Sequence, residues 1–114
     1  MSISFGGIGE LSVTFMADAT VKKGCPVKMT ANDTVKVCAD GDRMIGVAVE
    51  ASDDGYATIQ LCGYVTLSYT GTAPSVGYTK LAANGNGGMK SDSAGGEYLV
   101  LDVDTSAKTV GFII

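Results

Sequence analysis

The chain of 114 residues contains no histidine and no tryptophan, and only 2 prolines. Without histidine, the commonest general base near neutral pH is missing, and neither a Ser-His-Asp nor a Cys-His site can form within one chain. Without tryptophan, the chain lacks the usual side chain on which a sugar ring stacks. These absences argue against an enzyme, so we expect no catalytic residue and no cofactor.

Basic clusters and long apolar runs are also scarce. The largest basic cluster is the pair Lys22-Lys23 and the net charge is −4, whereas proteins that follow a phosphate backbone usually present a basic face. No apolar run approaches the roughly 20 residues needed to cross a bilayer. The segment Met1–Gly9 lacks the basic start and apolar core of a signal peptide. We therefore expect synthesis without export, and neither a nucleic-acid nor a membrane partner.

The three cysteines are Cys25, Cys38 and Cys62. Their spacing matches no zinc pattern, and no histidine is present to complete one, so we expect no metal site. Two interpretations stay open. Either all three are buried or half-buried thiols that act as small apolar residues, or two of them form a disulfide and one thiol is spare.

Alternation of apolar and polar residues is what the chain does contain, most clearly from Met44 to Tyr69. A period of two is typical of a strand with one buried and one wet face, as in antiparallel sheet. In the first of its three runs, we expect Gly46, Ala48 and Glu50 to face solvent. The residues expected inside are Ile45, Val47 and Val49, then Ala57, Ile59 and Leu61 after the turn Asp53-Asp54-Gly55, and Val65, Leu67 and Tyr69 beyond Gly63.

Turn residues separate many such short runs. The 16 glycines are about twice the usual share of roughly 7% and lie mostly where these runs end. Asn84–Gly88 begins with Asn-Gly, the strongest short signal for a type I′ hairpin turn. No fixed-period repeat is evident. The expected strands are 11–15, 27–30, 34–38, 45–50, 57–62, 64–69, 79–82, 89–91, 98–103 and 109–114.

These patterns predict an all-β fold, a small antiparallel β-barrel or sandwich of roughly nine or ten short strands. Residues 1–10 are expected to form a flexible N-terminal arm, and residues 11–114 a single β-barrel domain. The turn carboxylates Asp40, Asp42, Asp53 and Asp54 lack the ligand order of a calcium loop. We interpret them as solvated turn residues, with a bound cation or paired-carboxylate chemistry as alternatives.

The five tyrosines leave three interpretations open: structural packing, a protein interface, or a ligand-binding face. They are Tyr56, Tyr64, Tyr69, Tyr78 and Tyr98.

The order of several short motifs resembles a known family. Gly24-Cys25-Pro26-Val27-Lys28 is similar to a Gly-Asp-Pro-Val opening, with Cys25 where an Asp is usual. The segments Met44–Ala48, Asp54–Val65 and Ala73–Gly77 follow in order, and then the closing hairpin Tyr98–Ile114. This arrangement, over roughly residues 11–114, resembles the small β-barrel decoration (cement) proteins of tailed-phage and prophage capsids.

The resemblance implies a structural protein without catalytic activity. Such a protein binds the outer surface of the phage head and stabilises the capsid by bridging subunits of the major capsid protein, as a homotrimer at local three-fold positions. Its location would be the virion, on the outer capsid surface, after synthesis in the host cytoplasm. The alternatives are a receptor- or glycan-binding β module of a phage fibre or tail, and a part of a tail tube or baseplate.

Two segments are the candidate protein contacts, because each carries apolar residues outside a clear core pattern. The first is the arm Ser2–Glu10, which we expect to add to a capsid subunit in extended form. The second is the loop Thr70–Tyr78. The interface residues expected in and beside them are Ser2, Ile3, Phe5, Ile8 and Leu11, and Tyr69, Thr72, Pro74, Val76 and Tyr78.

Overall fold

The computed structural model describes residues 9–52 and 54–114, which contain ten strands and no helix. The all-β prediction and the number of strands are thereby confirmed. The predicted N-terminal arm lies outside the described residues, apart from Gly9 and Glu10. The strands are β1 Leu11–Ala17, β2 Pro26–Ala31, β3 Thr34–Val37, β4 Gly46–Ala51, β5 Tyr56–Cys62, β6 Tyr64–Thr70, β7 Gly77–Ala83, β8 Met89–Ser91, β9 Gly96–Asp104 and β10 Thr109–Ile113.

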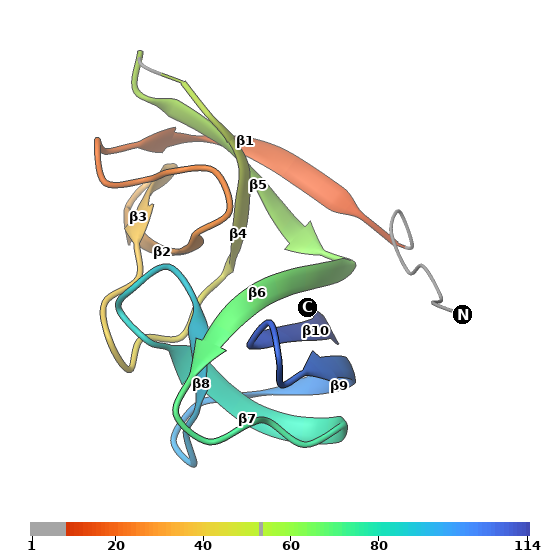
Figure 1. Ribbon diagram of the computed structural model, residues 1–114. Coiled ribbons are helices and arrows are strands. Elements are labelled where there is room, and N and C mark those ends of the chain that lie inside the picture. Colours follow the sequence, from red (N-terminus) through yellow and green to blue (C-terminus); the bar gives the residue numbers. More distant parts are fainter. Residues whose placement is uncertain (1–8, 53) are drawn as a thin grey trace.

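The strands close into two five-stranded barrels rather than one. The N-terminal barrel has the order β1-β3-β2-β4-β5, and the C-terminal barrel has the order β6-β8-β7-β9-β10. Figure 1 shows the first above the second, with β5 leading directly into β6. Neighbouring strands are antiparallel, as expected, except for the parallel pairs β1–β3 and β6–β8.

The two barrels therefore repeat one topology, strand for strand and direction for direction. Even an irregularity recurs, since the pairing of the last two strands in each barrel skips one residue. Beside that bulge, Ile59 lies opposite Ala48 in one barrel and Phe112 lies opposite Val100 in the other, and all four are buried. The two barrels share their strand pairing but not their amino-acid sequence, which explains why the sequence shows no fixed-period repeat.

Gly63 joins the barrels and confirms the predicted hinge between two strands. Its φ of 105° is a left-handed conformation that side chains other than glycine's rarely adopt. Its N–H donates to the Ile114 carbonyl oxygen at 3.3 Å, and the Ile114 N–H donates to the Gly63 oxygen at 2.9 Å. The last strand is thus tied to the link between the barrels, as its apolar sequence predicts.

Each barrel has its own core cluster, but the C-terminal cluster draws on both halves. Cys38, Met44 and Val47 come from the N-terminal half and pack with residues of β6–β10 such as Leu67 and Phe112. The N-terminal cluster contains Val21, Cys25, Val27, Val35, Ala48, Ala57 and Ile59. The shared cluster gives the barrels one continuous packed junction.

Strand β4 lies between these clusters and corrects one expectation. Val47 contributes to the C-terminal cluster, whereas Ala48, expected on the wet face, is 1% exposed in the N-terminal cluster. Alternation still holds, but both faces of β4 are covered there because a second barrel packs against it. Only Glu50 of the expected wet residues is exposed.

Hydrogen bonds and ion pairs across the loop Ala39–Arg43 reinforce the junction. The Gly41 N–H donates to the Ala83 carbonyl oxygen at 2.8 Å, and the Ala83 N–H donates to the Asp42 backbone carbonyl oxygen at 2.9 Å. Lys90 of β8 lies 3.0 Å from Asp40, and Lys28 of β2 lies 2.5 Å from Asp42. The two aspartates, expected to be solvated turn residues, therefore act as ion-pair partners that position this loop.

The connection Asn84–Gly88 is a hairpin loop, as predicted, but Asn84 rather than a type I′ turn organises it. The Asn84 side chain is buried, and its Oδ1 accepts from the N–H groups of Asn86 at 2.8 Å and Gly88 at 3.1 Å. Its Nδ2 donates to Thr70 and to the Met89 carbonyl oxygen. The Asn84 side chain thus organises the loop together with the backbone hydrogen bond from the Asn84 N–H to the Gly88 carbonyl oxygen at 3.0 Å.

Substituting the core residue Ile59 tests the N-terminal core. Ile59 is fully buried, so Ile59→Ala should lower the free energy of unfolding by about 2–5 kcal/mol, through lost apolar contact and a residual cavity. Val13 pairs with Ile59 across β1 and β5 but is 38% exposed, so Val13→Ala is the matched control and should cost less than about 1 kcal/mol. Urea unfolding measures both, and equal losses would contradict the described core.

The ion pair of Asp42 should give stability a specific pH dependence. The Lys28 ammonium, followed by the Ala39 N–H, lowers the pKa of Asp42 from its ordinary 3.8. A carboxylate with a lowered folded-state pKa stabilises the fold above pH 3.8 and loses that contribution as the pH falls through the lowered value. Wild type should therefore exceed Asp42→Asn in stability at pH 6 but not in strong acid.

Thermal unfolding across this pH range measures the difference. Asp102→Asn removes an exposed carboxylate outside the described ion pairs and should show no such change. A wild-type advantage over Asp42→Asn that persists unchanged in strong acid would contradict the assignment.

Candidate functional site

Of the predicted arm residues, Ser2, Ile3, Phe5 and Ile8 lie outside the described part of the chain. Leu11, the first residue of β1, is described and is 53% exposed. Beside it the Cys62 thiol donates to the Gly9 carbonyl oxygen at 3.2 Å. The start of β1 is therefore anchored to the end of β5 while its apolar side chain stays accessible.

Strand β1 carries exposed apolar side chains on both faces. Leu11 and Val13 lie on the same face of β1 as the half-buried Phe15, which packs against the N-terminal core. They extend this apolar face to side chains that the core does not cover. On the other face, Met16 pairs with Tyr56 of β5, and these side chains are 52% and 51% exposed. We name these four exposed residues, Leu11, Val13, Met16 and Tyr56, the β1 surface.

The second predicted contact, the loop before β7, divides into exposed and buried residues. Thr72 is exposed, and Val76 and Tyr78 are 68% and 73% exposed, as a contact surface requires. Tyr69 and Pro74 correct the prediction. Tyr69 is 3% exposed in the C-terminal core and Pro74 is buried, so neither side chain is available to a partner.

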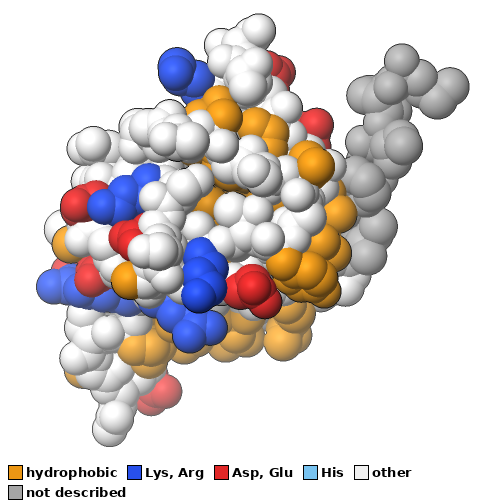
Figure 2. All heavy atoms as spheres, turned by 90° about the horizontal axis from the view of Figure 1, so that it is seen from below, with side chains coloured by type: hydrophobic (Ala, Val, Ile, Leu, Met, Phe, Trp, Pro, Cys, Tyr) orange, Lys and Arg blue, Asp and Glu red, His pale blue; other side chains and the backbone are white. Residues whose placement is uncertain are grey.

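Strand register extends this second surface across the C-terminal barrel. Tyr78 pairs with Leu99, Leu99 with Ile113, and Ile113 with Tyr64, which puts all four on the outer face of β7, β9, β10 and β6. With Val76 they form what we call the outer row. Figure 2 shows hydrophobic side chains gathered over one side of the lower face, beside a few charged ones.

Sequence reasoning missed the outer row beyond Tyr78. The available signal is Tyr98–Leu101, an uninterrupted apolar run, which places apolar side chains on both faces of β9. Gly111 is part of the same arrangement. A Cβ added there would lie 1.9 Å from the Tyr64 hydroxyl, so the missing side chain leaves room for the Tyr64 ring against the sheet.

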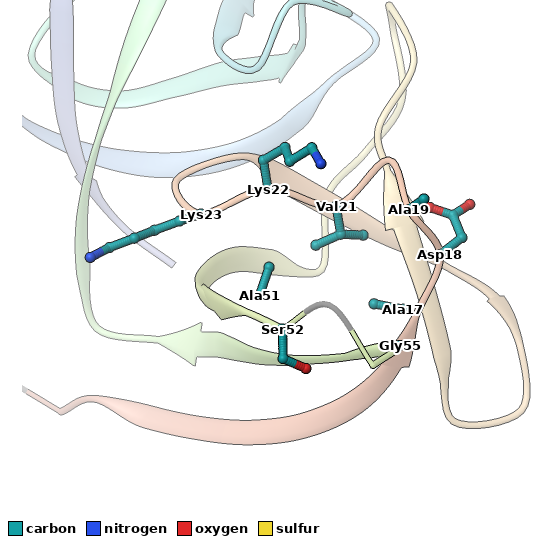
Figure 3. A pocket seen from close by; sticks show the side chains of 9 residues that line it. All are labelled: Ala17, Asp18, Ala19, Val21, Lys22, Lys23, Ala51, Ser52 and Gly55. Atoms are coloured by element: carbon teal, nitrogen blue, oxygen red, sulfur yellow. The ribbon is translucent and has the colours of Figure 1, made fainter.

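A pocket of about 310 Å³ lies beside β1 in the N-terminal barrel, between the loop after β1 and the end of β4. Small side chains such as Ala17, Ala51 and Ser52 line it, together with Lys22 and Lys23. Figure 3 shows Asp18 and Lys23 pointing outward in opposite directions. The Asp18 carboxylate is held by the Thr20 hydroxyl and N–H, which lower its pKa. The Ser52 hydroxyl, which also lines the pocket, donates to the Asp54 carboxylate.

The described cysteines and acidic residues were the candidates for a metal site. Within residues 9–52 and 54–114, no three His, Cys, Asp or Glu side chains are grouped to hold a metal ion. All three cysteines are free thiols, which favours the buried-thiol interpretation over a disulfide. Burial raises the pKa of Cys38 to about 11, so its thiol stays protonated and unreactive near neutral pH.

The five tyrosines do not all gather on one face, although Tyr64 and Tyr78 share the outer face of the C-terminal barrel. Tyr69 is buried, Tyr64 and Tyr98 are half-buried, and the strongly exposed Tyr56 and Tyr78 belong to different barrels.

In the part of the chain that the structure describes, no helix is long and apolar enough to cross a membrane. Among the described residues, every exposed large apolar side chain except Met29 belongs to the β1 surface or the outer row.

Comparisons with known proteins add no assignment. No family model matches this chain, and no curated protein sequence matches it.

Thiol labelling tests the described cysteine environments. At neutral pH, the half-buried Cys62 should react first with a disulfide reagent, whereas Cys25 and Cys38, 7% and 2% exposed, should react only after unfolding. Cys62→Ser should abolish the fast phase and Cys25→Ser should leave it unchanged. Rapid labelling of two or more thiols in the folded protein would contradict this arrangement.

Proposed function

We propose that this protein is a non-enzymatic structural component of a tailed-phage virion. It binds the outer surface of the head and stabilises the capsid by bridging subunits of the major capsid protein. The sequence resemblance supplies the family. The observation that carries the proposal is the presence of two separate exposed apolar surfaces, one on each barrel, which a bridging protein requires.

Their placement supports bridging. Figure 1 places β1 at one end of the molecule and β7 at the other, and the longest dimension is 39 Å. The packed junction through Met44 and Val47 links the two ends through a shared core instead of a free linker. A pull on one end is therefore transmitted to the other, as a clamp against outward pressure needs.

The β1 surface comprises four apolar side chains and the outer row five, which suits a modest contact rather than an obligate interface. Such contacts gain strength when many copies repeat them over a shell, because linked binding events raise the effective concentration. The net charge of −4 is consistent with a partner other than nucleic acid. In this proposal the N-terminal segment and the loop with Val76 and Tyr78 contact different capsid subunits, and the resemblance implies a homotrimer at a local three-fold axis.

Head binding by variants tests the proposal. Tyr78→Ala should weaken binding to expanded heads that lack decoration by about thirtyfold, because aromatic anchors often contribute at least 2 kcal/mol at interfaces. Deletion of residues 1–8 should abolish saturation of the heads. Met29→Ala is the matched control, since Met29 is 43% exposed but belongs to neither the β1 surface nor the outer row.

Co-sedimentation with purified heads measures these affinities. Saturating binding by both the Tyr78→Ala variant and the deletion variant would contradict the proposal. Binding of the isolated protein to glycans without binding to heads would instead favour the alternative, a receptor- or glycan-binding module of a fibre or tail.

A further inference from the structure

Strand β1 has an open edge that nothing in the described structure covers. On one side it pairs with β5 from Leu11 to Met16. On the other side it pairs with β3 only at Met16 and Ala17. The backbone from Leu11 to Phe15 therefore presents hydrogen-bonding groups along that edge, and Leu11, Ser12, Val13 and Thr14 are all exposed.

The composition of β1 does nothing to prevent pairing with another strand. Proteins usually protect such an edge with a charged residue or a proline. The sequence of β1, Leu-Ser-Val-Thr-Phe-Met-Ala, contains neither a charged residue nor a proline. The whole chain has 8 basic and 12 acidic residues, and none of these 20 lies in β1. An uncharged strand rich in β-branched and apolar residues is well suited to add a further strand.

The C-terminal barrel repeats this topology, and its equivalent strand edge can be compared with that of β1. Strand β6 corresponds to β1, and it too pairs with its parallel neighbour only at its last two residues. There, however, the N-terminal half lies against it. The Gln60 Nε2 donates to the Tyr64 carbonyl oxygen at 3.2 Å, and Val65 and Leu67 are 6% and 5% exposed in a cluster with Met44 and Val47.

The equivalent part of β1 has no such cover among the described residues. Val13 is 38% exposed, and Leu11 is 53% exposed. The two barrels therefore differ at one matched place, where β6 is covered from within the chain and β1 is left open.

We propose that the open edge of β1 pairs with β1 of a second copy of this chain. The strands run antiparallel about a two-fold axis at Val13, so that Val13 faces Val13 and Leu11 faces Phe15 of the other copy. Ser12 and Thr14 then face each other on the opposite side. The five-residue edge joins the two N-terminal barrels by continuous sheet hydrogen bonding.

The properties of the β1 edge favour a second copy of this chain as the partner strand. An isologous contact needs a self-complementary surface, and an antiparallel strand paired with itself is self-complementary in its hydrogen bonds. The uncharged side chains of β1 place no like charges opposite one another, even though each copy carries a net charge of −4. Apolar Leu11, Val13 and Phe15 of both copies would share one face.

The inference goes beyond the proposed function because pairing needs no capsid. It leaves the exposed Met16 and Tyr56 of the β1 surface available to a capsid subunit, and neighbouring three-fold positions on an icosahedral shell are related by two-fold axes. A β1 pair would then link one group of three copies to the next.

Opposite charges at the two-fold axis test the pairing in the full chain. Val13→Lys and Val13→Glu each place like charges directly opposite and should weaken the association about tenfold or more, so each variant should sediment with a lower average mass than wild type. An equimolar mixture should regain the wild-type mass, because lysine then faces glutamate. The pair Val76→Lys and Val76→Glu is the control and should leave the mass unchanged.

Sedimentation equilibrium gives the masses, and circular dichroism checks that each variant is folded. If the Val13 variants do not fold, double lysine and double glutamate variants of the exposed Ser12 and Thr14 carry the same test. A monomeric wild type, or variants that associate like wild type, overturns the inference. Association that appears only after deletion of residues 1–8 also overturns it, because the chain's own N-terminal segment would then occupy the edge.

Discussion

Packing between the two barrels is the constraint on which the rest of the structure depends. The N-terminal core cluster holds seven buried residues, and the C-terminal cluster includes Cys38, Met44 and Val47 from the other half. Burying these side chains covers one end of the C-terminal barrel and closes both faces of β4. The corresponding part of the N-terminal barrel receives no such cover from residues 9–52 and 54–114, and Leu11 and Val13 are exposed there.

This asymmetry connects the fold to the proposed role. Two barrels of one topology would offer the same surfaces twice, but their contact with each other covers the β6 edge and spares the β1 edge. The surfaces that stay exposed therefore lie at opposite ends of a joined body, with an open strand at one end and Val76 and Tyr78 at the other. A bridging protein needs this arrangement, and no part of it requires a catalytic group.

The sequence predicted every strand, because alternation is a local property that each run displays by itself. It did not predict two barrels, because strand partners are set by contacts distant in the sequence. The error at Ala48 has that same origin, since alternation indicates two faces but not what covers each of them. Alternation placed Tyr69 correctly inside, and only its assignment to the contact loop was wrong. Tyr64, Leu99 and Ile113 join the outer row through register across four strands, so only Val76 and Tyr78 at its exposed end could be predicted.

Electron cryomicroscopy of expanded heads incubated with the full chain is the most direct test of the central claim, that this molecule bridges capsid subunits through its two ends. The account predicts density for both barrels on the outer surface, with the β1 end and the β7 end touching different major capsid subunits. Density attached through one end alone, or heads without added density at saturating protein concentration, would contradict it.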